Sequence, residues 1–175
     1  MIAAALAAPN AGALPASGVQ PFSGRYEGRQ QLAFLTATAV ALIELRRSSR
    51  FILYTMHTTV RAAFIERRFL ECSVMRFHDG RPQPVEYVHR DKSSPEHDVH
   101  TRFDWAAASA TTTFGDAREP RTVALDGPAW DPMSYQVALI ALAPKHVPGD
   151  REQFRVIERG VLKEHDATFV GTVAA

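Results

Sequence analysis

The chain has 175 residues, of which 46% are hydrophobic and 22% are charged, an ordinary composition for a globular protein. This length suits one domain that buries roughly 70% of the surface of its unfolded chain. Lys and Arg together number 20 and Asp and Glu number 19, which leaves a formal charge of only +1. Because neutralisation of phosphates dominates the affinity of proteins for nucleic acids, this balance argues against a nucleic-acid partner.

The first 20 residues, MIAAALAAPNAGALPASGVQ, contain no charged side chain and are rich in Ala. Small residues flank a single position at 5–7 (Ala-Leu-Ala) and at 11–13 (Ala-Gly-Ala), as in the cleavage region of a secretory signal, but the basic start of such a signal is missing. We expect residues 1–20 to be the remnant of a signal peptide, with a flexible leader as the alternative, and residues 21–175 to form a single β-rich domain. Since no run approaches the ~20 apolar residues that a membrane-spanning helix needs, we expect no transmembrane segment.

From residue 21 onward, β-branched and aromatic residues recur at a period of two, which predicts β-strands. The Asp79-Gly80 pair suits the positive φ angles of a tight hairpin turn, and Arg159-Gly160 joins the last two expected strands. In the sixth strand, the alternation places Phe103 and Trp105 on the same side as Val99. The expected strands cover 22–30, 36–47, 50–60, 65–77, 84–90, 99–114, 151–160 and 161–171.

The stretch AWDPMSYQVALIALAP, residues 129–144, has the pattern of a helix. Asp131 is a good N-cap residue, Pro132 suits the first helical position, and Pro144 stops the run, which predicts a helix over about 131–143. Apolar residues occur nearly all round this helix, so it must be well covered by other elements. The side chains expected on its exposed side are few and small: Ser134, Gln136, Ala138 and Ala141.

These elements predict a mainly β fold. We expect a curved antiparallel sheet or a partly open barrel, with strands connected as a meander and with the one helix packed against the sheet.

Three histidines, His89, His97 and His100, are close in the sequence and suggest a metal site, which would need three or four converging ligands. The loop between them is better explained as a solvated polar segment. Cys72 is the only cysteine, and we expect it to be a small buried apolar residue. Without a Gly-x-Ser-x-Gly elbow, a Gly-rich phosphate loop or a convincing carboxylate pair, we predict no catalytic residue, no metal and no cofactor, and hence not an enzyme.

The aromatic residues allow two interpretations. Most of them are core in either case, but a curved sheet that one helix covers incompletely would leave an apolar cleft for a hydrophobic small molecule or a lipid. In the alternative, the core is fully packed and a sheet edge binds another protein of the cell envelope. The residues expected to line the cleft are Tyr87, Phe103, Trp105, Tyr135, Val137 and Ile140.

Several short motifs occur in a characteristic order: PFSGRYEG from residue 21, DGRPQPVEY from 79, TRFDWAAASATTTF from 101, LDGPAWDPMSYQVALIALA from 125 and FRVIERGVLKEHDATFVG from 154. In this order and spacing the chain resembles the bacterial family called domain of unknown function 3108. The resemblance extends over about residues 21–171. The elements that carry it are Asp79, Gly80, Pro84, Tyr87, Phe103, Asp104, Trp105, Asp131, Pro132 and Ser134.

The resemblance implies an exported protein of Gram-negative bacteria with a signal peptide, a mostly antiparallel β body and a periplasmic location. The family provides no catalytic residues to transfer. Its members continue with further strands after a Gly-Thr segment, whereas this chain ends at GTVAA, so we expect a truncated C-terminus and an unpaired sheet edge. The outline of curved sheet and helix resembles periplasmic lipoprotein carriers, an analogy of fold that does not by itself establish function.

We therefore expect a periplasmic or envelope protein that binds an apolar or lipid-like ligand between sheet and helix. The alternatives are an envelope interaction or assembly protein without a ligand and, third, a hydrolase or metalloenzyme.

Overall fold

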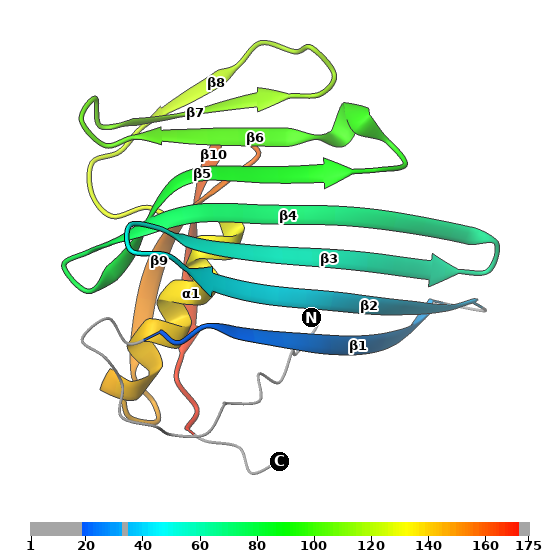
Figure 1. Ribbon diagram of the computed structural model, residues 1–175, viewed down its shortest axis with the longest axis horizontal. Helices are drawn as coiled ribbons and strands as arrows, with labels where there is room; N and C mark the ends of the chain where they lie inside the picture. Colours follow the sequence, from blue (N-terminus) through cyan, green and yellow to red (C-terminus); the bar gives the residue numbers. More distant parts are fainter. Residues whose placement is uncertain (1–18, 33–34, 172–175) are drawn as a thin grey trace.

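The computed structural model describes residues 19–32 and 35–171, and its main element is an antiparallel sheet of eight strands (Figure 1). The strands follow one another across the sheet in sequence order, which confirms the predicted meander. Such an order results when tight turns connect successive strands. The strands are β1 (Phe22–Leu32), β2 (Leu35–Arg47), β3 (Ile52–Ala62), β4 (Ile65–His78), β5 (Arg81–Asp91), β6 (Val99–Asp104), β7 (Ser109–Phe114) and β8 (Arg121–Ala124).

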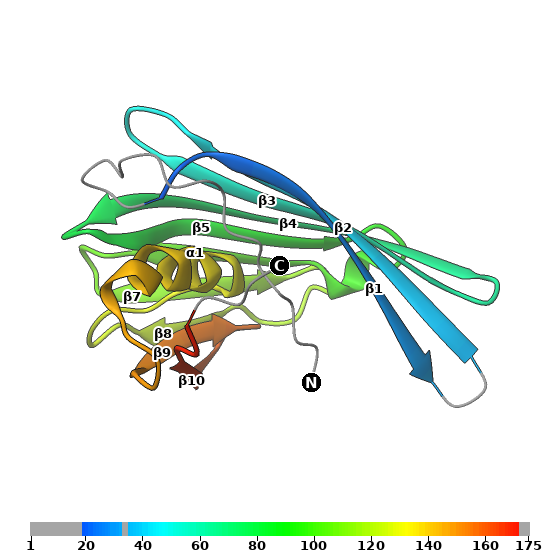
Figure 2. The same cartoon turned by 90° about the horizontal axis from the view of Figure 1, so that it is seen from below.

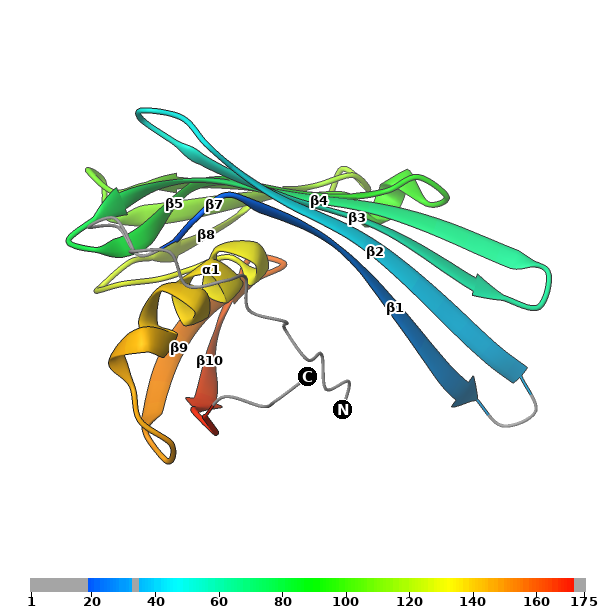
Figure 3. The ribbon, with the colours of Figure 1, turned by 60° about the horizontal axis from the view of Figure 1, so that its bottom comes forward.

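The sheet is curved and not closed into a barrel, so β1 and β8 are its two edges. Figures 2 and 3 show the remaining elements beneath its concave face: helix α1 (Pro132–Leu142) and a hairpin of β9 (Arg151–Glu158) and β10 (Val161–Thr168). Short 3-10 turns, η1 (Pro95–His97) and η2 (Ala143–Lys145), lie in two of the connections. The ends of β1 to β4 extend beyond the helix (Figure 3).

Helix α1 lies between the sheet and the β9–β10 hairpin, which explains why its sequence is apolar nearly all round. Met133 and Val137 pack against the sheet together with Tyr54 of β3. Ala138 and Leu142 pack on the other side of the helix, against the side chains of β9. The helix was predicted correctly, but three of its four expected exposed residues are buried: Ser134, Ala138 and Ala141. They face the hairpin or the sheet, and only their small size made them look like an exposed side.

Two strand predictions were wrong around residues 99–124. The expected single strand over 99–114 is a hairpin of β6 and β7, because the Asp104 carboxylate accepts hydrogen bonds from the backbone N–H groups of Ala106 and Ala107 and turns the chain there. Ala108, with φ of 47°, completes the turn. The segment after Phe114, expected to be a loop, contains the short edge strand β8.

The register between β4 and β5 shifts once. Val74 pairs with Glu86 but Met75 pairs with Pro84, which leaves Val85 as the extra residue of a β-bulge. Strict alternation would place Val85 on one face with Tyr87; the bulge instead brings Pro84 and Tyr87 to the buried face.

At the start of the described chain, Val19 is buried in the core between sheet and helix. Residues 1–18 and 172–175 lie outside the described residues, so the predicted signal remnant and truncated C-terminus stay predictions there. In the part of the chain that the structure describes, no helix has the length and apolarity required to traverse a bilayer.

Candidate binding site

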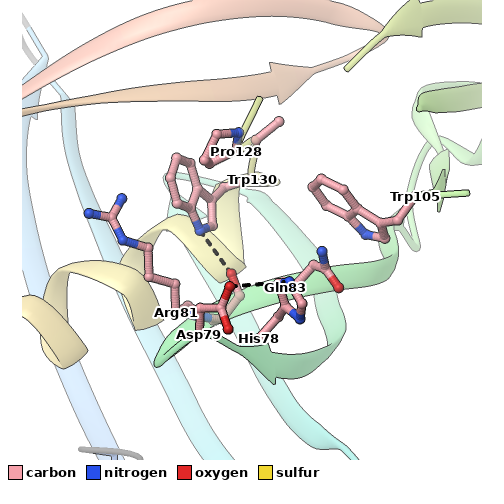
Figure 4. Close-up of a pocket in the computed structure, with 9 residues that line it drawn as sticks. His78, Asp79, Arg81, Gln83, Trp105, Pro128 and Trp130 are labelled. Carbon is pink, nitrogen blue, oxygen red and sulfur yellow. Dashed lines mark hydrogen bonds and ion pairs between the residues drawn. The ribbon is translucent and has the colours of Figure 1, made fainter. Parts of the chain in front are cut away.

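A pocket lies at one end of the sheet, beside the turn that joins β4 to β5 (Figure 4). Its volume is about 320 Å³, within the range of small-molecule sites. Three segments that are distant in the sequence form it: the β4–β5 hairpin, the end of β6 and the segment that leads into α1. The residues that line it are His78, Asp79, Arg81, Pro82, Gln83, Trp105, Pro128, Ala129 and Trp130.

Both tryptophans of the chain line this pocket, and β5 holds both of them. The indole N–H of Trp105 donates to the carbonyl of Pro84 at 2.6 Å. The indole N–H of Trp130 donates to the carbonyl of Pro82 at 3.0 Å. A proline has no backbone N–H, but its carbonyl still accepts hydrogen bonds. Each of these two carbonyls fixes the orientation of one indole ring. The polar atoms of both indoles are therefore already satisfied within the protein.

The two rings differ in their exposure. Trp130 is only 3% exposed and meets Phe154 edge-on, with ring centroids 5.2 Å apart and planes at 67°. Trp105 is half-buried and stacks on Phe103, with centroids 5.9 Å apart and planes at 10°. Trp130 thus forms a wall of the pocket, whereas Trp105 is stacked on Phe103 and is partly exposed at the pocket.

Polar side chains from the β4–β5 hairpin form the other side of the pocket. His78 Nε2 lies 3.4 Å from the Asp79 carboxylate, and Arg81 lies 3.4 Å from Glu152 of β9. Gln83 is half-buried and adds a neutral amide. Asp79 and Arg81 carry opposite formal charges, so the rim presents both donors and acceptors without a strong net charge.

The position of Trp130 depends on the residues on either side of it. Its backbone N–H donates to Arg155 and its carbonyl accepts from Ile157, which ties the segment to β9. The next residue, Asp131, is fully buried and caps α1: one carboxylate oxygen accepts from the N–H groups of Met133 and Ser134, both at 2.9 Å. The other oxygen accepts from the Ser73 hydroxyl at 2.8 Å. Burial raises the pKa of Asp131 in spite of these hydrogen bonds.

Comparison with known families gives a match to the one described as Protein of unknown function (DUF3108), over residues 26–172. The chain belongs to this family. Neither the curated proteins nor the solved structures include a significant match. The family description names no activity, so the function of this DUF3108 protein has to be argued from its own residues.

The short motifs by which the sequence resembles DUF3108 meet around the pocket. Asp79 and Trp105 line it, and Gly80 lies in the turn beside it with φ of 73°. Pro84 accepts the hydrogen bond of Trp105, and Asp131 directly follows Trp130. Motifs that were separate in the sequence are thus parts of one region of the fold.

The six residues expected to line a cleft do not come together in this DUF3108 chain. Tyr87, Val137 and Ile140 belong to the cluster between sheet and helix, and Val137 is 0% exposed. Phe103 and Trp105 belong to a second cluster, and Tyr135 packs in a third with the β9 side chains. Trp105 is the member of this set that lines the pocket.

The space expected beneath α1 is filled by side chains rather than open. Tyr54, Met75 and Met133 meet there, each 0% exposed. Tyr87 lies beside them with its hydroxyl donating to Glu71 at 2.7 Å, and burial raises its pKa. Burial alone would raise the pKa of Glu71, but this hydrogen bond and its contact with His89 lower it.

Of the nine residues that line the pocket, sequence analysis expected only Trp105 at a binding site, and Trp130 is one of the eight that it missed. It precedes the helix cap and is not among the residues expected to line a cleft. The signal that could have found it is its rarity, because it is one of two tryptophans and follows Pro128 closely in an otherwise small-residue segment.

The histidines that suggested a metal site do not converge. His89 lies 3.6 Å from Glu71, whereas His100, on the opposite face of the sheet, lies 2.5 Å from Glu86. His97 lies 3.6 Å from Asp91. Within residues 19–32 and 35–171, no group of three or more His, Cys, Asp or Glu side chains could hold a metal ion. Cys72, expected to be buried, is half-buried on the face of β4 that points away from α1.

Proposed function

We propose that this DUF3108 protein is a binding protein of the bacterial cell envelope, and that its pocket holds a small ligand with a flat apolar surface. The role is binding rather than catalysis. The observation that carries the proposal is that both tryptophans of the chain border one pocket and have their N–H groups tied to carbonyls of β5. Aromatic walls with a few convergent polar groups are typical of ligand sites.

The location of the proposed site differs from the cleft expected between sheet and helix. That interface is filled, with Val137 and Met133 fully buried, so an apolar ligand there would have to displace the core. The pocket lined by Trp105 and Trp130, the tryptophan pocket, requires no such rearrangement. The export of the protein is supported by the uncharged Ala-rich residues 1–20.

The test uses the two indole N–H signals of a ¹H–¹⁵N correlation spectrum, because both tryptophans lie at the pocket. A set of small ring compounds, namely cyclohexanol, phenol, indole and glucose, is titrated into the folded protein. We expect at least one compound to shift both signals in a saturable way. If the folded protein shows no saturable shift with any of them, the proposed function is wrong.

A second candidate is an interaction protein of the envelope without a ligand. It is favoured by the sheet face that points away from α1, where Leu42 is 50% exposed and the half-buried Leu53 and Val74 pair across β3 and β4. Exposed apolar patches mark interaction surfaces. Co-purification of an envelope protein that Leu42→Lys abolishes and Trp105→Ala leaves unchanged would favour this candidate.

A further inference from the structure

We propose that the ligand of the tryptophan pocket is a neutral sugar ring, a pyranose as a free sugar or as part of a glycan. This inference rests on the proposed function and names the ligand class of the same site. A pyranose has one face lined by C–H groups and an edge lined by hydroxyl groups. The pocket is divided in the same way. Apolar rings form one side, and a neutral amide and a pair of opposite charges form the other.

The apolar side of the pocket suits the C–H face of a sugar. Trp105 is half-buried at the pocket with its ring stacked on Phe103, so its remaining exposed aromatic surface is available to a flat partner. The pyrrolidine ring of Pro128 adds apolar surface beside Trp130 (Figure 4), and Pro82 also lines the pocket. An aromatic ring carries negative charge on its face, so it attracts the slightly positive C–H groups of a sugar ring.

The polar side of the pocket suits hydroxyl groups. A hydroxyl both donates and accepts, so it can bond to a carboxylate, a guanidinium or an amide. Asp79 supplies acceptors, Arg81 supplies donors, and the Gln83 amide supplies both. His78, beside Asp79, adds a ring nitrogen to the same rim. A polyhydroxylated ring can therefore satisfy several of these groups at once.

Three other ligand classes fit less well. An acyl chain would leave the polar side of the pocket unused, because it offers no hydrogen bonds to the four polar side chains of the rim. An anion would find a single guanidinium, that of Arg81, which already lies 3.4 Å from Glu152. A proline-rich peptide also packs on aromatic rings, but side-chain donors must then bond its carbonyls. Both indole donors are already used by Pro82 and Pro84, and proline, which has no N–H, would offer no donor to the Asp79 carboxylate.

The experiment compares neutral saccharides with competitors in the same spectrum of the two indole signals. Glucose, galactose, N-acetylglucosamine and their disaccharides form one arm; cyclohexanol, a tetraproline peptide and octanoate form the others. We expect saturable shifts of both signals by at least one saccharide, with a dissociation constant on the order of millimolar for a single ring. Disaccharides are expected to bind more tightly than the single rings.

Variants connect these shifts to the proposed contacts. Trp105→Ala is expected to weaken saccharide binding about tenfold, with Trp130 as the remaining reporter, and Trp105→Phe to retain most of it. Gln83→Ala, which removes an amide and leaves both rings, is expected to weaken saccharide binding several-fold and cyclohexanol binding very little. Leu42→Ala, on β2 and outside the pocket lining, is the control that leaves binding unchanged.

The outcomes separate the two proposals. If cyclohexanol, octanoate or tetraproline shifts the indole signals and no saccharide does, the sugar proposal is overturned and the pocket remains a ligand site. If a saccharide binds but Gln83→Ala and Trp105→Ala both leave its affinity unchanged, the sugar site lies elsewhere and this inference is also overturned. If no compound shifts either signal, both the proposed function and the sugar proposal are wrong.

Discussion

At the scale of single residues, Asp131 connects the fold to the pocket. It is the N-cap that the sequence predicted, and it forms a capping box with Ser134. In this box the backbone N–H of Asp131 donates a hydrogen bond to Ser134 Oγ at 2.9 Å. The sequence could not show that the carboxyl group is fully buried and bonded to Ser73, 58 residues away. The cap fixes the start of α1 and, through the preceding peptide, the position of Trp130.

The burial of Asp131 has a consequence for the pH dependence of stability. Its pKa is raised in the folded state, so its contribution to stability is present below its ordinary pKa of 3.8 and is lost as the pH rises through the raised value. Asp131→Asn keeps an acceptor for the helix cap and cannot ionise. We expect this variant to gain stability relative to the wild type as the pH rises from 3 to 7, as measured by urea unfolding at each pH.

A matched variant separates titration from capping. Asp131→Ala loses the accepted hydrogen bonds at every pH and is expected to be destabilised relative to Asp131→Asn by about 1–2 kcal/mol. Carboxyl groups whose pKa is lowered, such as Glu71 and Asp91, are present in all three proteins and cancel in the comparison. A stability difference between Asp131→Asn and wild type that does not change with pH would contradict the prediction.

At the scale of elements, the helix and most strands follow from the local sequence pattern. The features that were not predicted arise at a turn and at a β-bulge. The Asp79-Gly80 and Arg159-Gly160 turns have the positive φ angles expected of them. The β6–β7 turn was missed because its residues are Asp and Ala rather than Gly or Asn, and an Asp side chain forms the turn. The bulge at Val85 was missed because alternation carries no information about the partner strand.

Helix α1 allows an element-scale prediction because Met133 is a large, fully buried side chain at its contact with the sheet. Met133 is 0% exposed between the helix and the sheet, so Met133→Ala should leave a cavity and cost about 2–5 kcal/mol in the free energy of unfolding. Leu42→Ala removes a similar volume from a side chain that is 50% exposed and should cost less than about 0.5 kcal/mol. Urea unfolding of both variants checks this, and similar losses would show that α1 is not packed as described.

At the scale of the whole molecule, the β9–β10 hairpin covers α1 and its turn touches the edge of the sheet. A Cβ at Gly160 would lie 2.8 Å from Cβ of Arg121 in β8, a contact that side chains do not tolerate. Gly80 has the same φ of 73°, and a Cβ there would meet nothing within 4 Å. The two glycines therefore form a matched pair that differs in the close contact with β8 and the looser contact with Thr112 of β7.

We expect Gly80→Ala to lose about 1 kcal/mol of stability, the cost of a side chain at positive φ. Gly160→Ala should lose at least about 1 kcal/mol more, because the hairpin must also move away from β8. Chemical unfolding of the two variants gives the comparison. Equal losses of stability in the two variants would mean that the hairpin turn does not contact the sheet.

The sequence by itself determined the mainly β class, the meander, the helix with its Asp131-Pro132 start, and membership of a family through short motifs. These features depend on local periodicity, turn chemistry and order along the chain, all of which are visible from residues that are close together in the sequence. Tertiary structure alone decided that the space beneath Val137 is filled and that Trp105 and Trp130 meet at one pocket. The physical reason is that burial and pockets depend on which distant segments pack together: the sheet and the hairpin close on both sides of α1, and β5 carbonyls bring together two indoles that are 25 residues apart.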